Sequence, residues 1–391
     1  MKSINYERLA FISVTVFTFV LCIYGATLGI SYDEAKLFFA GHGAPFYLAK
    51  TTMLAFGQND FALRLPFIII HSISAFIFWE ISKIVCKKEV DAYISLLIFI
   101  LMPGLNIVAL LANKSGLLLF AALLTTFLIL KQRFILASIV MIIGAFSDNG
   151  YATLLIGIAA WGFSDRKYKF GALAGVLFLI CMVRFGFNDG GMPQGWFLET
   201  IGAYFALFSP FVFIFYLYAL FKLRKNPSLL WQITFWGIAL SLVLSLRQRV
   251  PLIDFAPYSI FAVPLAVGFF AREWRTKLPE FRLKYKVMGI ITFASLLLWS
   301  AASFFMQASL FVVSKPELCP LWPHMAAKEL SNELKGQNIY AINANGDDEL
   351  QTRLKWYGIE KSEDYNLSKS GGKVELPIYY GNKLIKKYYL E

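Results

Sequence analysis

Long apolar segments separated by short polar ones dominate the first 307 residues of the chain. Many of these segments approach or reach the roughly 17–25 residues with which a helix crosses a bilayer. The segments 134–146 and 151–163 are short for full crossings. Such a pair is typical of a helical hairpin that its neighbours shield from lipid. The pattern predicts eleven spans, at about 9–30, 66–82, 92–112, 116–130, 134–146, 151–163, 170–187, 201–221, 229–246, 251–271 and 287–307.

Basic residues cluster after every second span. Because loops rich in Lys and Arg stay in the cytoplasm, this alternation predicts a cytoplasmic amino terminus and a carboxy terminus on the opposite, outer side of the membrane. The same parity places the loop 31–64 and several short turns on the outer face. The basic clusters are Lys2/Arg8, Lys83/Lys87/Lys88, Lys131/Arg133, Arg166/Lys167/Lys169, Lys222/Arg224/Lys225 and the run from Arg272 to Lys286.

The composition becomes polar after residue 307. The runs 338–343 and 374–380 have strand character, and 349–357 has helix character. We therefore expect two domains: a membrane domain, 1–307, that includes the outer loop 31–64, and a small periplasmic α/β domain, 308–391. A cap or an interaction module is the expected role of the second domain.

Composition agrees with a polytopic α-helical membrane protein. Hydrophobic residues make up 58% of the chain and charged residues only 16%, against about 25% in soluble proteins. From Lys315 to Glu391 the 11 basic and 11 acidic residues cancel, so the whole net charge of +12 belongs to the membrane part and indicates topology, not nucleic-acid binding. The four Cys and three His are scattered, so we expect neither a disulfide framework nor a metal site, and no cofactor.

Two adjacent carboxylates, Asp33 and Glu34, follow the first apolar segment. Carboxylates at a membrane surface are costly to desolvate, so the pair indicates either a wet functional pocket or a solvated loop. Neighbouring residues of an extended segment point to opposite sides, so one carboxylate is expected to face the chemistry while the other has a structural role.

Cations are rare on the predicted outer face, which makes each of them a candidate phosphate ligand. Arg247 and Arg249 lie where one span ends and the next begins, and Lys114 and Lys50 are expected to support them. The alternative for each is snorkelling to the lipid headgroups. The candidate substrate contacts on this face are His42, Tyr47, Arg64 and Asp148, of which Asp148 is also typical of a turn.

Several motifs resemble the GT-C superfamily of membrane glycosyltransferases, in the branch of lipid A aminoarabinose transferases and protein O-mannosyltransferases. Asp33-Glu-Ala35 is similar to the Asp-Glu-Ala of the first outer loop in that branch, and Pro45-Phe-Tyr47 to its Pro-Leu-Tyr. The most specific motif, Phe56-Gly-Gln-Asn-Asp-Phe-Ala-Leu-Arg-Leu-Pro66, resembles Phe-Gly-x-x-x-Phe-Ala-x-Arg-Leu-Pro. Asn113-Lys114-Ser115 stands where the branch has Arg-x-Asp, so the sugar donor of the branch is not carried over.

The resemblance implies an inverting transfer of a sugar from a polyprenyl-phosphate carrier to a hydroxyl of a lipid, glycan or protein. Asp33 would be the general base, Glu34 its helper, and Arg247 and Arg249 would stabilise the phosphate leaving group. Membrane lipids are the other expected partners. The expected location is the bacterial inner membrane, with multiple spans, a cytoplasmic amino terminus and a periplasmic carboxy terminus. Two alternatives stay open: a flippase or exporter of lipid-linked oligosaccharides, and an inactive GT-C-like scaffold.

Overall fold

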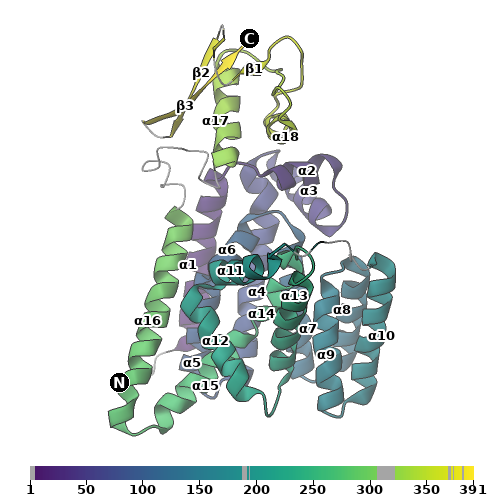
Figure 1. Cartoon of the computed structure of the whole chain (residues 1–391), viewed down its shortest axis with the longest axis vertical. Coiled ribbons are helices and arrows are strands. Elements are labelled where there is room, and N and C mark those ends of the chain that lie inside the picture. The colour runs from purple at the N-terminus through teal and green to yellow at the C-terminus, as the bar shows by residue number, and fades with distance from the viewer. Residues whose placement is uncertain are drawn as a thin grey trace. The chain divides into compact units, whose positions relative to one another are not determined.

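The computed structural model describes residues 5–186, 192, 194–305, 322–368, 371–372, 374–380 and 383–391. It is an α-helical polytopic membrane protein with a small sheet near its carboxy terminus, as the hydrophobic pattern predicts (Figure 1). The described residues divide into two compact units. The first unit comprises 1–19 and 67–300, and the second comprises 20–66 and 301–391.

The first unit is a helical bundle around one extended apolar core. Three helices, α1 (Tyr6–Thr27), α4 (Asp60–Val85) and α16 (Pro279–Phe304), contribute residues to both units. The remaining elements of this unit are α5 (Glu89–Leu101), α6 (Pro103–Leu110), α7 (Lys114–Leu130), α8 (Phe134–Ser147), α9 (Tyr151–Ser164), α10 (Tyr168–Phe185), α11 (Trp196–Phe208), α12 (Pro210–Leu223), α13 (Leu229–Ser245), a 3-10 turn (Leu252–Asp254), α14 (Ala256–Ser259) and α15 (Ala262–Thr276).

Small residues let several of these helices approach closely. A Cβ on Gly157 of α9 would lie 2.7 Å from the Cα of Ile233 in α13, and one on Gly162 would lie 2.6 Å from the Cα of Gly171 in α10. Helices in a bilayer gain stability mainly from such close packing, because lipid removes the hydrophobic drive between them. The predicted hairpin 134–163 accordingly packs against α10, and α8, α9 and α10 stand side by side (Figure 1).

The described helices differ from the predicted spans in length and straightness. Four, α1, α4, α10 and α16, are long and apolar enough to cross a membrane, and up to six spans result if two bent pairs each count as one. The predicted spans 92–112 and 201–221 are bent, by 56° where Pro103 follows α5 and by 104° at Ser209-Pro210. Proline lacks the N–H that would continue the helix, which accounts for both positions. Eleven crossings stay a prediction.

The second unit contains a compact α/β module. Its elements are α2 (Tyr32–Ala40), α3 (Ala44–Phe56), α17 (Trp322–Gly336), α18 (Asp348–Trp356), β1 (Leu367–Ser368), β2 (Val374–Tyr380) and β3 (Lys383–Leu390). The strands form an antiparallel sheet in the order β1-β3-β2 with a bulge at Ile378/Tyr379, and α17 packs against β2. Apolar residues of α17, α18 and the sheet form a separate core.

The predicted α/β character of the tail is confirmed, but its elements differ in detail. Segment 338–343 forms only isolated bridges, at Ala341 and Asn343, instead of a strand, and the sequence interpretation did not include α17 or β3. The boundary predicted at residue 307 does not coincide with the compact units, because the loop 31–64 shares a unit with the tail. A membrane domain 1–307 and an outer domain 308–391 stay a prediction, and 308–321 lie outside the described residues.

Candidate functional site

Asp33 lies in the first turn of α2, a helix with a well-formed amino-terminal cap. The Ser31 hydroxyl accepts a hydrogen bond from the Glu34 N–H (3.1 Å), and the Glu34 carboxylate accepts one from the Ser31 N–H (2.9 Å), so the two form a capping box. Asp33 is exposed, and its carboxylate has no hydrogen bond among the described residues. The structure thus presents Asp33 to solvent on an ordered turn.

The neighbouring carboxylate has the opposite environment. Glu34 is 1% exposed and forms a bidentate ion pair with Arg64 of α4, with Nε–Oε1 at 3.0 Å and Nη2–Oε2 at 2.8 Å. Arg64 itself is fully buried. Its remaining N–H groups donate to three carbonyls at the end of α1, those of Gly25 (3.0 Å), Leu28 and Gly29 (2.8 Å). All five N–H donors of the guanidinium are therefore used within the protein.

This network changes the interpretation of two candidate residues. Arg64 was expected to contact substrate, but its donors are occupied and no part of it is accessible. Its arrangement is that of a structural residue that ties the end of α1 to the start of α2. Glu34 was expected to assist Asp33, and its contacts are those of a residue that holds the turn on which Asp33 is carried.

The other candidates of the loop 31–64 are accessible. His42 follows α2, and Tyr47 and Lys50 belong to α3, a helix of thirteen residues. Tyr47 is 63% exposed, and the Lys50 ammonium lies 5.6 Å from the ring centre of Phe46. These side chains are free to meet a ligand, whereas their roles as substrate or phosphate contacts stay predictions.

Two polar residues of the motif 56–66, Gln58 and Asp60, bind the carboxy-terminal module. Asn59 caps α4 through the Ala62 N–H (2.7 Å), and Gln58 donates to the carbonyl of Trp356 (2.9 Å). The buried Asp60 carboxylate accepts hydrogen bonds from the Trp356 indole (3.0 Å) and the Tyr357 hydroxyl (3.1 and 3.2 Å). The motif 56–66, which resembles a GT-C motif, therefore contains a docking site for the tail.

Electrostatics strengthens this docking. The Lys328 ammonium lies 2.9 Å from Asp60, and the Tyr357 hydroxyl accepts from the Ile30 N–H (2.9 Å). Burial raises the pKa of Tyr357, and the negative charge of Asp60 raises it further, so the hydroxyl remains protonated and able to donate. A polar pocket of about 480 Å³ beside this network is lined by Asp60, Lys328 and Lys335.

We expect Asp60→Asn to loosen the tail. The amide keeps the shape but removes the charge that pairs with Lys328, and hydrogen bonds to a buried charge contribute about 1.5–3 kcal/mol. Limited proteolysis should then cleave within 322–391 about tenfold faster or more. Glu363→Gln, which removes an exposed carboxylate of the same module, is the control. Equal cleavage rates for the two variants would contradict the docking role of Asp60.

In the first unit, Lys114 lies between two carboxylates. Its ammonium is 3.1 Å from Asp148 and 2.8 Å from Asp254, and Asp148 also accepts from the Gly150 N–H (2.8 Å) in the turn between α8 and α9. Burial alone would lower the pKa of Lys114, but the two carboxylates raise it overall, so the ammonium is retained. The sequence suggested that the Lys114 ammonium binds a phosphate. In the structure two carboxylates surround this one ammonium, so its charge is already compensated.

Arg247 and Arg249 follow α13 and are both exposed. Arg249 pairs with Glu199 of α11, with Nη2–Oε1 at 2.9 Å, and its guanidinium carbon lies 5.8 Å from the ring centre of Trp196. The Arg247 guanidinium forms no hydrogen bond or ion pair with another residue in the described part of the chain, whereas its backbone N–H continues the helical turn by donating to the Leu244 carbonyl. Of the predicted cations in this unit, Arg247 is therefore the most available for an anion.

The structure thus brings Asp33, Glu34 and Arg64 together in the second unit, and Lys114 with Asp148 in the first. Sequence reasoning missed Asp254, Glu199 and Asp60 as partners of these groups. Asp254 is the one charged residue of the predicted span 251–271, and a carboxylate is costly to place in lipid, so this position is the signal by which it could have been found. Within the described residues, no three His, Cys, Asp or Glu side chains are grouped so as to hold a metal ion.

Comparison with known proteins supports the architecture. No family model and no curated protein matches the sequence. Among solved structures, the chain is similar to ArnT from Cupriavidus metallidurans, a structure bound to undecaprenyl phosphate. The TM-score is 0.59 at 12% sequence identity, over 92% of this chain and 86% of that chain. A likeness at this identity concerns the fold. The chain therefore has the fold of the GT-C membrane glycosyltransferases, the superfamily whose motifs residues 33–66 resemble.

Proposed function

We propose that the protein is a membrane glycosyltransferase that moves a sugar from a polyprenyl-phosphate donor to a hydroxyl of a lipid, glycan or protein at the outer face of the bacterial inner membrane. The observation that carries the proposal is the exposed carboxylate of Asp33, held on a capped helical turn by the buried Glu34–Arg64 pair. The GT-C fold supports it, and ArnT, which shares that fold, binds undecaprenyl phosphate.

In the proposed reaction, Asp33 accepts the proton of the acceptor hydroxyl. The hydroxyl oxygen then forms a bond to the anomeric carbon of the sugar, and the bond from that carbon to the phosphate oxygen breaks with inversion. A carboxylate placed on an ordered turn, with no competing partner among the described residues, is suited to this role because it loses little entropy on reaching the hydroxyl.

The leaving phosphate needs positive charge. Arg247 is the first candidate because it is exposed and its guanidinium is not committed to a described partner, and Arg249 is the second because its pair with Glu199 is exposed and weak. Lys50 is exposed and can contribute. Lys114 is a weaker candidate than the sequence suggested, since two carboxylates already neutralise it.

The function is tested by adding polyprenyl-phosphate sugars to the purified full-length protein in lipid nanodiscs and following release of the polyprenyl phosphate with an envelope extract as acceptor. Glycan and lipid profiling of a deletion strain identifies the sugar and the acceptor together. Movement of the donor between leaflets without release of polyprenyl phosphate would instead indicate a flippase. Neither movement nor release with any donor would favour the inactive scaffold.

Arg247→Ala should weaken donor binding. Loss of one charged contact to a phosphate is expected to raise the donor KM about tenfold, while the acceptor KM stays within about twofold. Steady-state kinetics with varied donor and varied acceptor provides the measurement. Arg282→Ala, an exposed arginine of the basic run predicted to be cytoplasmic, is the control. An unchanged donor KM in Arg247→Ala would remove Arg247 from the phosphate site.

A further inference from the structure

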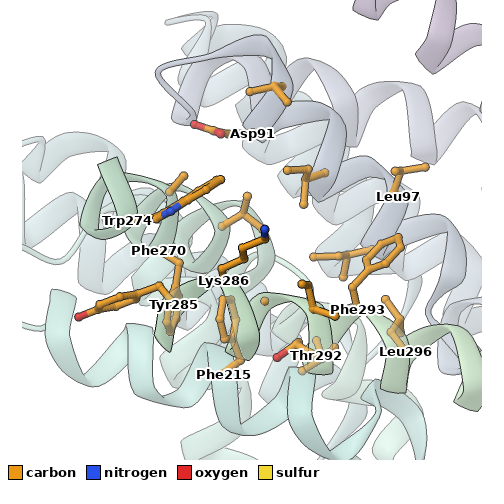
Figure 2. Close-up of a pocket in the computed structure, with 18 of the residues that line it drawn as sticks. Asp91, Leu97, Phe215, Phe270, Trp274, Tyr285, Lys286, Thr292, Phe293 and Leu296 are labelled. Carbon is orange, nitrogen blue, oxygen red and sulfur yellow. The ribbon is translucent and has the colours of Figure 1, made fainter. Parts of the chain in front are cut away.

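An apolar pocket lies within the first unit, between α5, α12, α15 and α16 (Figure 2). Its volume is about 440 Å³, within the ~300–1,000 Å³ of pockets that enclose small ligands. The walls are formed by side chains such as Leu97, Phe215, Phe270, Phe293 and Leu296. No residue of the candidate catalytic or phosphate site contributes to it.

The pocket exists because α16 packs loosely on its neighbours. Leu296 and Ser300 are the buried residues of this helix, and Gly289 leaves open space where a side chain would stand. Protein interiors are normally packed as densely as organic crystals, and an apolar space of this size next to a bilayer is poorly filled by water. The lining therefore suits a hydrocarbon chain.

One end of the pocket carries polar and aromatic groups. Arg275 forms a bidentate pair with the buried Asp91, with Nη1–Oδ2 at 2.7 Å, so its charge is compensated. Lys286 is exposed and has no ion pair among the residues that the structure describes. Figure 2 shows its side chain extending into the space that the lining side chains enclose. Trp274 and Tyr285 accompany it, as aromatic residues do at the headgroup level of membranes.

The surrounding charge identifies the headgroup. The run from Arg272 to Lys286 contains six basic and two acidic residues, and it is the most basic of the clusters predicted to face the cytoplasm. Such segments attract the anionic lipids of the cytoplasmic leaflet, with about 1 kcal/mol for each Lys or Arg near the surface. The pocket thus combines an apolar body with an unpaired ammonium.

We propose that this pocket binds an anionic membrane phospholipid, with one acyl chain between α5, α12, α15 and α16 and its phosphate at Lys286. The proposal does not depend on the proposed function. A polyprenyl phosphate is a less suitable occupant, because the volume accommodates one acyl chain and not a long isoprenoid.

The test is native mass spectrometry of the full-length protein titrated with phosphatidylglycerol or with phosphatidylcholine of the same chains. We expect the first bound lipid to be phosphatidylglycerol, with an affinity several times higher. Lys286→Gln should lower that affinity about fivefold, as the loss of one charge predicts, and leave phosphatidylcholine binding unchanged. Lys284→Gln, an exposed neighbour that does not line the pocket, should leave both affinities unchanged.

A second experiment measures lipid binding to a variant in which a side chain fills the pocket. Gly289→Leu places a side chain in the open space without a backbone clash, and should abolish the high-affinity lipid. Gly175→Leu in α10, where a Cβ would also meet nothing within 4 Å, is the matched control. Lipid binding that Gly289→Leu leaves intact would overturn the proposal. The proposal would also be overturned if Lys286→Gln left the preference for phosphatidylglycerol unchanged. The same holds if polyprenyl phosphate displaced bound phosphatidylglycerol while phosphatidylglycerol did not displace bound polyprenyl phosphate.

Discussion

Asp33→Asn is expected to lower the rate of sugar transfer by about 10²–10⁴-fold, the usual contribution of a general base. The asparagine amide keeps the size of the side chain and its place in the first turn of α2, but it cannot accept the proton of the acceptor hydroxyl. The capping box of Ser31 and Glu34 does not involve the Asp33 side chain, so the helix should remain intact. The measurement is the initial rate of polyprenyl phosphate release at saturating donor and acceptor.

The matched control for this variant is Asp364→Asn, which removes another exposed carboxylate of the second unit. Thermal unfolding of the purified proteins should show the same midpoint for both variants and the wild type. Transfer at the wild-type rate by Asp33→Asn would exclude Asp33 as the base. A lower kcat at an unchanged donor KM would support the role, since the base acts on the acceptor.

Arg64→Met is expected to destabilise the second unit by about 3–5 kcal/mol. The substitution leaves the Glu34 carboxylate buried without a counter-charge and frees three carbonyl groups at the end of α1. Uncompensated buried charges are far more costly than broken surface pairs. The predicted result is a lower midpoint of thermal unfolding, together with a reduced transfer rate because the turn that carries Asp33 loses its support.

Two comparisons make this prediction specific. Arg247→Met removes an exposed guanidinium and should change the unfolding midpoint little. The double variant Arg64→Met with Glu34→Leu removes both charges and should recover part of the lost stability, since an apolar pair avoids the desolvation penalty. A single Arg64→Met variant as stable as Arg247→Met would show that the buried pair does not hold the loop.

The amphipathic and apolar patterns determined much of the architecture. Runs such as 9–30 and 287–307 are long and apolar. In lipid, a single segment can satisfy all its backbone hydrogen bonds only as a helix, so α1 and α16 follow from the sequence. The mixed α/β character of the tail was equally visible in local composition. The motif 56–66 also indicated the GT-C fold before the structure did, because its residue types and spacing are specific.

Local sequence could not decide which polar groups meet. Asp33 and Glu34 are adjacent and chemically alike, and only the position of Arg64, thirty residues away, buries one and leaves the other exposed. Asp60 looked like a member of the same motif as Arg64, yet Trp356 and Tyr357 of the tail determine its role. Lys114 has the sequence context of a free cation, but in the structure Asp148 and Asp254 lie beside its ammonium. The sequence therefore determined the helices and the candidate carboxylates, whereas long-range pairing of charges, which no local pattern encodes, decided which of them remain available for chemistry.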